Sequence, residues 1–315
     1  MYEKWKGVHT RCAFNMIQEL IPLTRPRTLA AALGPTILGA AFSYYAFGAA
    51  QGTGLAIFHT VLIFLAVVTA QIVANLWNEY KDFKSGLDAG QKVGNAGSIT
   101  RGVITPELII TMIKALMFVP IIIGLYLSAT ITWYYIPVGF LCILISFLYS
   151  GGPKPISRTP FGEISSGIAM GFAIVLITGY AWIRELSLAL LIPAIPSTLL
   201  VGSIMLTNNI RDIRNDESHG RHTLPIVLGR ERALSLMSIS YIFNFIWIIA
   251  WIIVGHMTWF ALLAFLAAPL AFKTIHTLST NTDEFQLDKA MGTTAGAAMI
   301  YQLMWAVGLI MGKLI

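Results

Sequence analysis

Charged residues are scarce in this sequence. Asp, Glu, Lys and Arg make up 11% of the 315 residues, whereas soluble globular domains carry about 25%. None of the four residue types occurs between Thr28 and Asn78, and the mean hydropathy of the chain is +0.72. A soluble globule of this length does not need so much apolar surface, so lipid is the solvent for most of this chain.

Cysteine is scarce as well. The two cysteines, Cys12 and Cys142, lie far apart, the first in a basic N-terminal segment and the second within an apolar run. They suggest neither a disulfide framework nor a metal site. No small-residue cleavage site ends the first apolar run, so we expect no removable signal peptide.

Long apolar runs dominate what is present. A helix needs about 20 apolar residues to cross the hydrocarbon core, and it satisfies its own backbone groups within lipid. The runs predict nine membrane-spanning helices, at residues 28–47, 54–77, 104–126, 131–149, 164–183, 187–210, 233–254, 258–278 and 290–312. We therefore expect an all-α, polytopic integral membrane protein, with a basic N-terminal segment (1–27) followed by a single transmembrane domain (28–315).

The positions of Lys and Arg provide an independent test of this count. With nine spans, 18 of the 21 Lys and Arg residues fall on one side of the membrane, and the exceptions are Lys114, Arg184 and Lys313. Cytoplasmic loops carry an excess of Lys and Arg. The pattern predicts a multi-pass protein of the cell membrane whose N-terminus and even-to-odd loops are cytoplasmic. The net charge of +6 reflects this topology and gives no reason to invoke nucleic acid.

Acidic residues gather at the predicted cytoplasmic ends of the second and sixth spans. The stretch "NLWNEYKDFKSGLD" ends the second span and "TNNIRDIRND" ends the sixth, and together they carry five carboxylates: Glu79, Asp82, Asp88, Asp212 and Asp216. Asn78 and Asp82 are four residues apart, as are Asn208 and Asp212. Residues at this spacing share one face of a helix. Two such sets at matched depth predict a shared ligand.

The ligand that these groups favour is a metal-bound diphosphate. Carboxylates cost about 2.5–3.5 kcal/mol each at the centre of a membrane helix and less near the interface. Mg²⁺ is typically held by a few carboxylates while a phosphate supplies further ligands. Six basic residues on the same predicted side could hold phosphate oxygens: Arg101, Lys154, Arg158, Arg211, Arg214 and Arg221. For any single Asp the alternative remains open that the charge only ends a helix and solvates a loop.

The two acidic stretches resemble the signatures of the polytopic UbiA-type aromatic prenyltransferases. That family carries Asn-Asp-x-x-Asp-x-x-x-Asp on its second helix and Asp-x-x-x-Asp, preceded by Asn, on its sixth. The corresponding residues here are Asn78, Glu79, Asp82 and Asp88, followed by Asn209, Asp212 and Asp216. Glu79 stands where Asp is usual, and Asp88 follows Asp82 by six residues instead of four. Helix count and motif placement extend the resemblance over nearly the whole chain.

The resemblance implies roles for individual residues. Mg²⁺ would bind Asn78, Glu79, Asp82, Asp88, Asp212 and Asp216. The substrates would contact Asn78, Arg101, Tyr149, Arg158, Asn208, Asn209 and Arg221. The expected catalytic residues are Asp82, Asp212 and Lys154. Tyr149 and Lys154 come from "YSGGPKPISRTPFGE", a connection in which relatives often carry a Tyr and a Lys.

The resemblance also implies an activity, the transfer of a polyprenyl chain from an allylic prenyl diphosphate to an aromatic acceptor. The stretches "NEYKDFKSGLD", "GNAGSITRGVIT" and "GGPKPISRTPFGE" look most like the menaquinone branch. That branch implies 1,4-dihydroxy-2-naphthoate as acceptor, with loss of CO₂ and diphosphate. Prenylation of 4-hydroxybenzoate is one alternative, and an ion-coupled secondary transporter is another from a different class. The expected partners are the two substrates and membrane lipid, with no protein partner implied.

Overall fold

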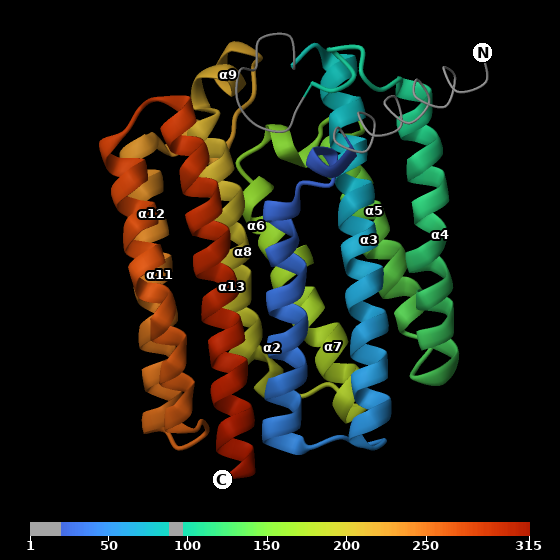
Figure 1. Ribbon diagram of the computed structural model, residues 1–315, viewed down its shortest axis with the longest axis vertical. Helices are drawn as coiled ribbons and strands as arrows, with labels where there is room; N and C mark the ends of the chain where they lie inside the picture. Colours follow the sequence, from blue (N-terminus) through green and yellow to red (C-terminus); the bar gives the residue numbers. More distant parts are fainter. Residues whose placement is uncertain (1–19, 88–96) are drawn as a thin grey trace, which may run out of the picture.

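The computed structural model describes residues 20–87 and 97–315, and this described part is helical throughout, without strands (Figure 1). Within these ranges seven helices are long and apolar enough to cross a membrane, and α5 (Tyr135–Ser150) is a shorter apolar helix. With α2 (Ala30–Phe47) they make nine rods in the described ranges, each overlapping one predicted span. The prediction of an all-α polytopic membrane protein is confirmed.

The seven longer rods are of two kinds. Four are single helices: α3 (Thr53–Ser85), α4 (Pro106–Thr130), α11 (Arg230–Ile253) and α13 (Glu284–Leu314). Three are composite: α6 (Gly162–Ser166) continues through the π-helical η3 (Gly167–Phe172) into α7 (Ala173–Ile183), η4 (Leu188–Leu190) leads into α8 (Leu191–Arg211), and η5 (Trp259–Ala267) leads into α12 (Ala268–Thr280).

Helix α3 extends beyond the predicted span, which ended at residue 77. Lipid thickness limits the length of an apolar run, but an α-helix can continue into water because its hydrogen bonds are internal. The helix ends only at Gly86, whose φ of 74° places it in the left-handed region that glycine adopts readily. Asn78, Glu79 and Asp82 therefore lie on the last turns of one continuous helix.

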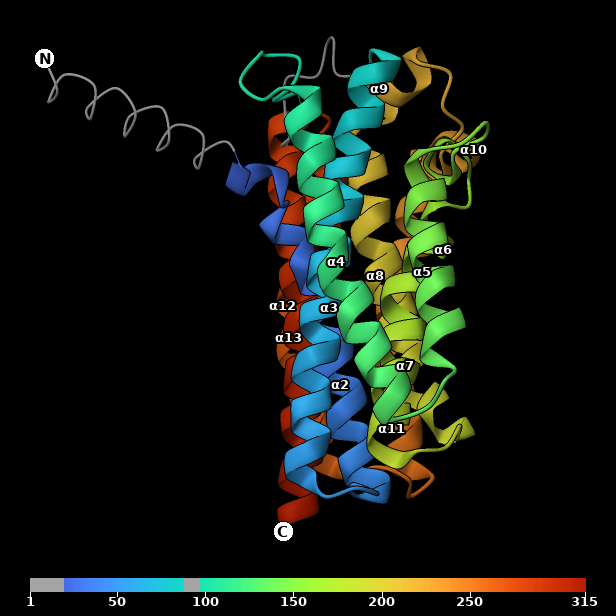
Figure 2. The same cartoon turned by 90° about the vertical axis from the view of Figure 1, so that its right-hand side faces the viewer.

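The C-terminal ends of α3 and α8 lie at the same end of the bundle. Figures 1 and 2 show this end carrying α9 (Ile213–Ser218), and Figure 2 shows α10 (Leu224–Leu228) near it. The C-terminus of the chain lies at the opposite end (Figure 1). Both acidic stretches are thus presented on one side of the membrane, as an even number of crossings between them requires.

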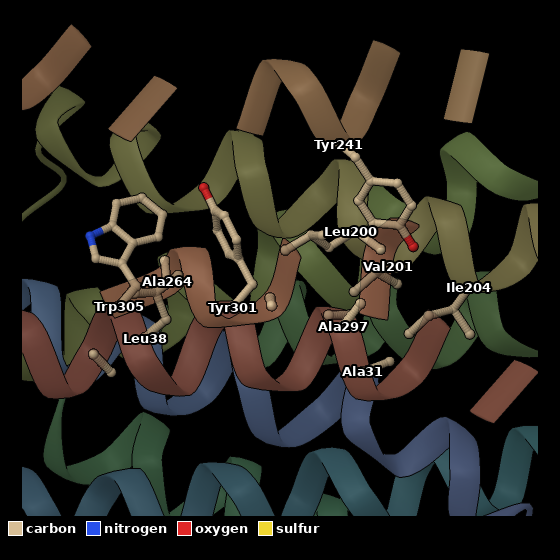
Figure 3. Close-up of a cluster of buried hydrophobic side chains, with 14 of the residues drawn as sticks. Ala31, Leu38, Leu200, Val201, Ile204, Tyr241, Ala264, Ala297, Tyr301 and Trp305 are labelled. Atoms are coloured by element: carbon tan, nitrogen blue, oxygen red, sulfur yellow. The ribbon is translucent and has the colours of Figure 1, made fainter. Parts of the chain in front are cut away.

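The main core lies where α13 packs against α2, α8 and η5 (Figure 3). Trp305 and Tyr301 of α13 are fully buried there. Small residues allow the rods to approach closely: a side chain at Gly308 would collide with the backbone of Phe260, and a Cβ at Gly171 would lie 2.6 Å from Ser197 O. The second of these close approaches holds the rod that begins with α6 directly against α8.

Candidate active site

One arginine joins the two acidic stretches. Arg221, in the loop between α9 and α10, donates from Nη2 to Asp82 Oδ1 at 2.9 Å and contacts Asp216 Oδ1 through Nη1 at 3.2 Å. Asp82 belongs to the last turn of α3, and Asp216 belongs to α9. Both carboxylates are buried, with relative exposures of 9% and 2%. Residues from both stretches therefore share one guanidinium.

A second arginine holds the third carboxylate. Arg211, the last residue of α8, donates to both oxygens of Asp212 at 2.7 Å, from Nε and from Nη2. Its Nη2 also donates to Asn208 Oδ1 at 2.8 Å, and its Nη1 donates to Asp288 Oδ1 at 2.9 Å. Asp288 lies on α13, so this guanidinium ties the second acidic stretch to the last helix.

The carboxamides next to the acidic residues connect neighbouring helices. Asn78 Oδ1 accepts a hydrogen bond from Ser150 Oγ at 2.9 Å, which joins α3 to the end of α5. Asn209 Nδ2 donates to Glu163 Oε1 at 2.8 Å, which joins α8 to α6, and both of these residues are buried. The two motifs are therefore built into the bundle and do not hang from its loops.

Glu79 has other partners. Its Oε1 accepts hydrogen bonds from the backbone N–H groups of Gly97 at 2.9 Å and Ser98 at 2.8 Å, and the residue is 1% exposed. The carboxylate thus anchors the connection that leads to α4. Both bonds go to the same carboxylate oxygen, Oε1. The role of Glu79 as a metal ligand stays a prediction.

The remaining predicted residues occupy the same end with looser contacts. The backbone O of Arg158, in η2 (Ile156–Arg158), accepts from His222 N at 3.0 Å, and the Arg158 charge interacts with Asp82. Arg101 is exposed and donates to Ser98 Oγ at 3.3 Å. Lys154 is exposed, and within the described ranges no hydrogen bond or ion pair joins it to the acidic residues. Asp88 lies outside the described residues.

The pKa of Asp216 reflects its burial and its charged neighbours. Burial raises the pKa of the Asp216 carboxyl to about 7; Arg221 opposes this rise, whereas the neighbouring carboxylates of Asp212 and Asp82 add to it. A carboxyl whose ionised form is disfavoured mainly by burial, and further by two nearby carboxylates, is one whose charge an additional cation would stabilise. The site therefore favours a cation beyond the two arginines.

The donor atoms fit Mg²⁺ in kind. Carboxylate and carboxamide oxygens are the protein ligands that this hard cation takes, usually one or two carboxylates together with waters and phosphate. Among the described residues no three carboxylate, His or Cys groups converge on one point, because Asp82 and Asp216 are directed to Arg221 and Asp212 is directed to Arg211. A small number of protein ligands suits a metal that arrives with a phosphate.

An elongated cavity of about 280 Å³ begins beside this site. Its polar end is lined by Asn78, Asn208 and Tyr149, and its other end by apolar groups that include Ile63 and Leu127. Most of its lining comes from α3, α4, α5 and the rod of α6, η3 and α7. A molecule with a polar head and a long apolar tail matches this distribution of side chains.

Arg25 also lines the polar end of the cavity and was missed by the sequence analysis, which assigned it to the N-terminal segment. Its backbone has a φ of 51°. Two carboxamides of α3 hold the flanking backbone: Asn75 Nδ2 donates to Thr24 O at 3.0 Å, and Gln71 Nε2 donates to Thr28 O at 2.7 Å. The available signal was the row of polar amides within the apolar second span, which needed buried partners.

Comparison with known proteins identifies relatives along most of the chain. A family model described as the UbiA prenyltransferase family matches residues 32–306. A Bacillus subtilis (strain 168) protein named 1,4-dihydroxy-2-naphthoate octaprenyltransferase is 35% identical, over 94% of this chain and 93% of its own length. A Mycobacterium tuberculosis (strain ATCC 25618 / H37Rv) protein of the same name is 29% identical, over 92% of this chain and 96% of its own.

Solved structures share the fold. A UbiA homolog from Aeropyrum pernix K1 aligns with a TM-score of 0.67 at 16% identity, over 90% of this chain and 97% of its own. A UbiA homolog from Archaeoglobus fulgidus bound to DMAPP and Mg²⁺ aligns with a TM-score of 0.59 at 17% identity, over 92% of this chain and 99% of its own. The arrangement of helices is therefore one that has been determined for other proteins.

Proposed function

The chain belongs to the UbiA prenyltransferase family, and we propose that it transfers a polyprenyl chain from an allylic prenyl diphosphate to 1,4-dihydroxy-2-naphthoate, with Mg²⁺ as cofactor. CO₂ and diphosphate leave, as in a step of menaquinone biosynthesis. The names of the two relatives support the acceptor, and the DMAPP and Mg²⁺ bound to the Archaeoglobus homolog support the donor and the metal.

The observation that carries this proposal is the continuity between the acidic site and the apolar cavity. Asn78 and Asn208 line the cavity, and each is followed four residues later by an aspartate of the site. A diphosphate at the aspartates can therefore extend its attached prenyl tail into the cavity. The tail stays among apolar groups while the charged head stays at the membrane edge.

We assign the diphosphate to the basic side chains at this end. Arg221 already contacts carboxylates of both stretches, and its Nε is buried without a partner, so it can donate to a phosphate oxygen. Arg158 and Arg25 lie near enough to interact with Asp82, and Lys154 and Arg101 would complete the contacts from their loops. Asn78, Glu79, Asp82, Asp88, Asp212 and Asp216 would hold Mg²⁺, which would neutralise charge on the leaving diphosphate.

The reaction requires little proton transfer from the protein. As the bond between the allylic carbon and the diphosphate oxygen breaks, the electron-rich ring carbon that bears the carboxylate forms the new carbon–carbon bond. Loss of CO₂ from that carbon returns the electron pair to the ring. The chain's contributions are orientation of the acceptor by Tyr149 and Asn208 and exclusion of water from the allylic cation by the apolar lining.

We also propose that the site faces the cytoplasm of a cell in whose plasma membrane the protein lies. The distribution of Lys and Arg supports this orientation, because 18 of 21 fall on the side of the acidic stretches. The transmembrane helices form one domain from residue 28, and membrane lipid surrounds it.

A competition assay tests the proposed acceptor. The purified protein in nanodiscs receives 1,4-dihydroxy-2-naphthoate and 4-hydroxybenzoate together with geranyl or a longer prenyl diphosphate and Mg²⁺, and the products are separated by mass. Demethylmenaquinone-type products should dominate. Prenylation of hydroxybenzoate alone would refute the acceptor and leave the metal site standing, whereas no prenylation of either acid would refute the activity.

A further inference from the structure

The contact between Arg211 and Asp288 connects the last helix to the second acidic stretch. Arg211 is 9% exposed and makes four hydrogen bonds, to Asn208, to both oxygens of Asp212 and to Asp288. The first two of these residues belong to the proposed site, whereas Asp288 lies on α13 and outside either acidic stretch. A buried guanidinium with two anionic partners can lose one of them and keep the other.

The geometry at Asp212 creates a competition. Because Arg211 donates to both carboxylate oxygens at 2.7 Å, a metal ion that takes an oxygen of Asp212 competes with this bidentate pair for the charge of the same carboxylate and weakens it. Arg211 then needs another anion, since a buried charge that loses its partner is strongly destabilised. Asp288 is already 2.9 Å from Nη1 and fulfils that need.

We propose that Asp288 is a positioning residue for the metal site: it holds Arg211 when Asp212 turns to Mg²⁺, and it thereby sets the affinity of the site for the metal. The inference rests on the proposed function, in which Asp212 ligates Mg²⁺. Asp288 touches neither substrate nor metal in this account. Its effect passes through Arg211.

The test measures metal binding directly. Mn²⁺ replaces Mg²⁺ as the probe, and free Mn²⁺ is followed by electron paramagnetic resonance during titration of the purified protein in detergent with a non-hydrolysable prenyl diphosphate analogue present. Asp288→Asn should weaken Mn²⁺ binding about tenfold, at the lower end of the range for residues that support metal ligands. Turnover at saturating Mg²⁺ should change less than threefold, because Asp288 acts on metal affinity.

Two further variants separate the proposed role from a general effect of charge. Glu284→Gln removes one negative charge a turn earlier on α13 and should leave Mn²⁺ affinity within twofold of the wild type. Asp288→Glu keeps the carboxylate and should stay within threefold. The melting temperature of each variant should be measured as well, to test whether the fold is intact.

A double-mutant cycle tests the route through Arg211. In an Arg211→Gln background, Asp288→Asn should have no further effect on Mn²⁺ affinity, since the connecting residue is gone. An equal loss in both backgrounds, or wild-type affinity in Asp288→Asn, would overturn the inference and leave the proposed function intact. If the wild-type protein itself bound no Mn²⁺ with the analogue present, the proposed metal site would fail and the inference with it.

Discussion

Replacing Arg221 by Met should destabilise the protein in a way that depends on pH and on Mg²⁺. Met supplies an unbranched apolar side chain, and the substitution removes the positive charge that Asp82 and Asp216 share. The side chains of Arg221, Asp82 and Asp216 are 12%, 12% and 3% exposed, so water screens these ion pairs little. Removing one partner of a buried ion pair costs about 3–5 kcal/mol.

The pKa of Asp216 decides where in this range the loss should fall. That pKa is raised to about 7, so stability contributed by the protonated form is present at low pH and is lost as the pH rises through 7. At pH 6 the Asp216 carboxyl holds a proton, only Asp82 loses a charged hydrogen-bond partner, and we expect a loss of about 3 kcal/mol. At pH 8 the wild-type Asp216 is ionised beside Arg221, whereas the variant must either protonate this carboxyl or leave its charge without that partner, so the loss should be larger and approach about 5 kcal/mol.

Unfolding in detergent micelles by added dodecyl sulfate, followed by tryptophan fluorescence, measures the difference between variant and wild type at the two pH values. Mg²⁺ at 100 times its dissociation constant should recover about 2.7 kcal/mol in the variant, because the metal binds only the folded site. Arg214→Met, which removes an exposed arginine from α9, should change stability by less than about 0.5 kcal/mol. Equal losses at pH 6 and pH 8, or a loss as small as that of Arg214→Met, would refute the reasoning.

Three other predictions concern the site and the topology. Asp82→Asn and Asp212→Asn should each abolish prenyl transfer while the protein purifies normally; near-normal turnover at limiting Mg²⁺ would contradict the two-stretch metal site. Mg²⁺ affinity of the wild type should fall between pH 8 and pH 6, since a proton competes for Asp216, and Asp216→Asn should lose this pH dependence; an unchanged dependence would assign it to another group. Single cysteines in place of Ser85, Ser157 or Ser218 should be labelled from the cytoplasmic side, and a cysteine in place of Gly52 should be labelled from the other side. Labelling of the three serine positions from different sides would refute the topology.

The helices were predictable because membrane insertion imposes a simple pattern. Each span must bury about 20 apolar residues, and this requirement identified rods such as α4 and α11 within a few residues of their ends. The extension of a helix beyond its apolar run could not be predicted from this requirement. Residues such as Glu79 and Lys84 end an apolar run but are compatible with helix, so α3 continues to Ser85.

The partners of the site residues were less predictable than the residues themselves. Helical spacing placed Asn78 with Asp82 on one face, but no spacing indicates that Glu79 accepts from the backbone of Gly97 and Ser98. The bond between Arg211 and Asp288 depends on how α13 packs beside α8, which the sequence pattern leaves open. Contacts between distant segments depend on how closely the helices approach each other at small residues, and these approaches are known only from the three-dimensional structure.

The shape of the cavity has a consequence for the lengths of tail that the protein can accept. The lining residues on α3 run from Ile63 to Asn78, a distance of about 22 Å at 1.5 Å per residue. Val138 of α5 lines the cavity and is 38% exposed. A tail longer than this distance would have to leave the cavity between helices, where the surrounding lipid would accept it without contact with water. We therefore expect the protein to recognise the head of its donor and the first few isoprene units, and to place no upper limit on the number of units that follow.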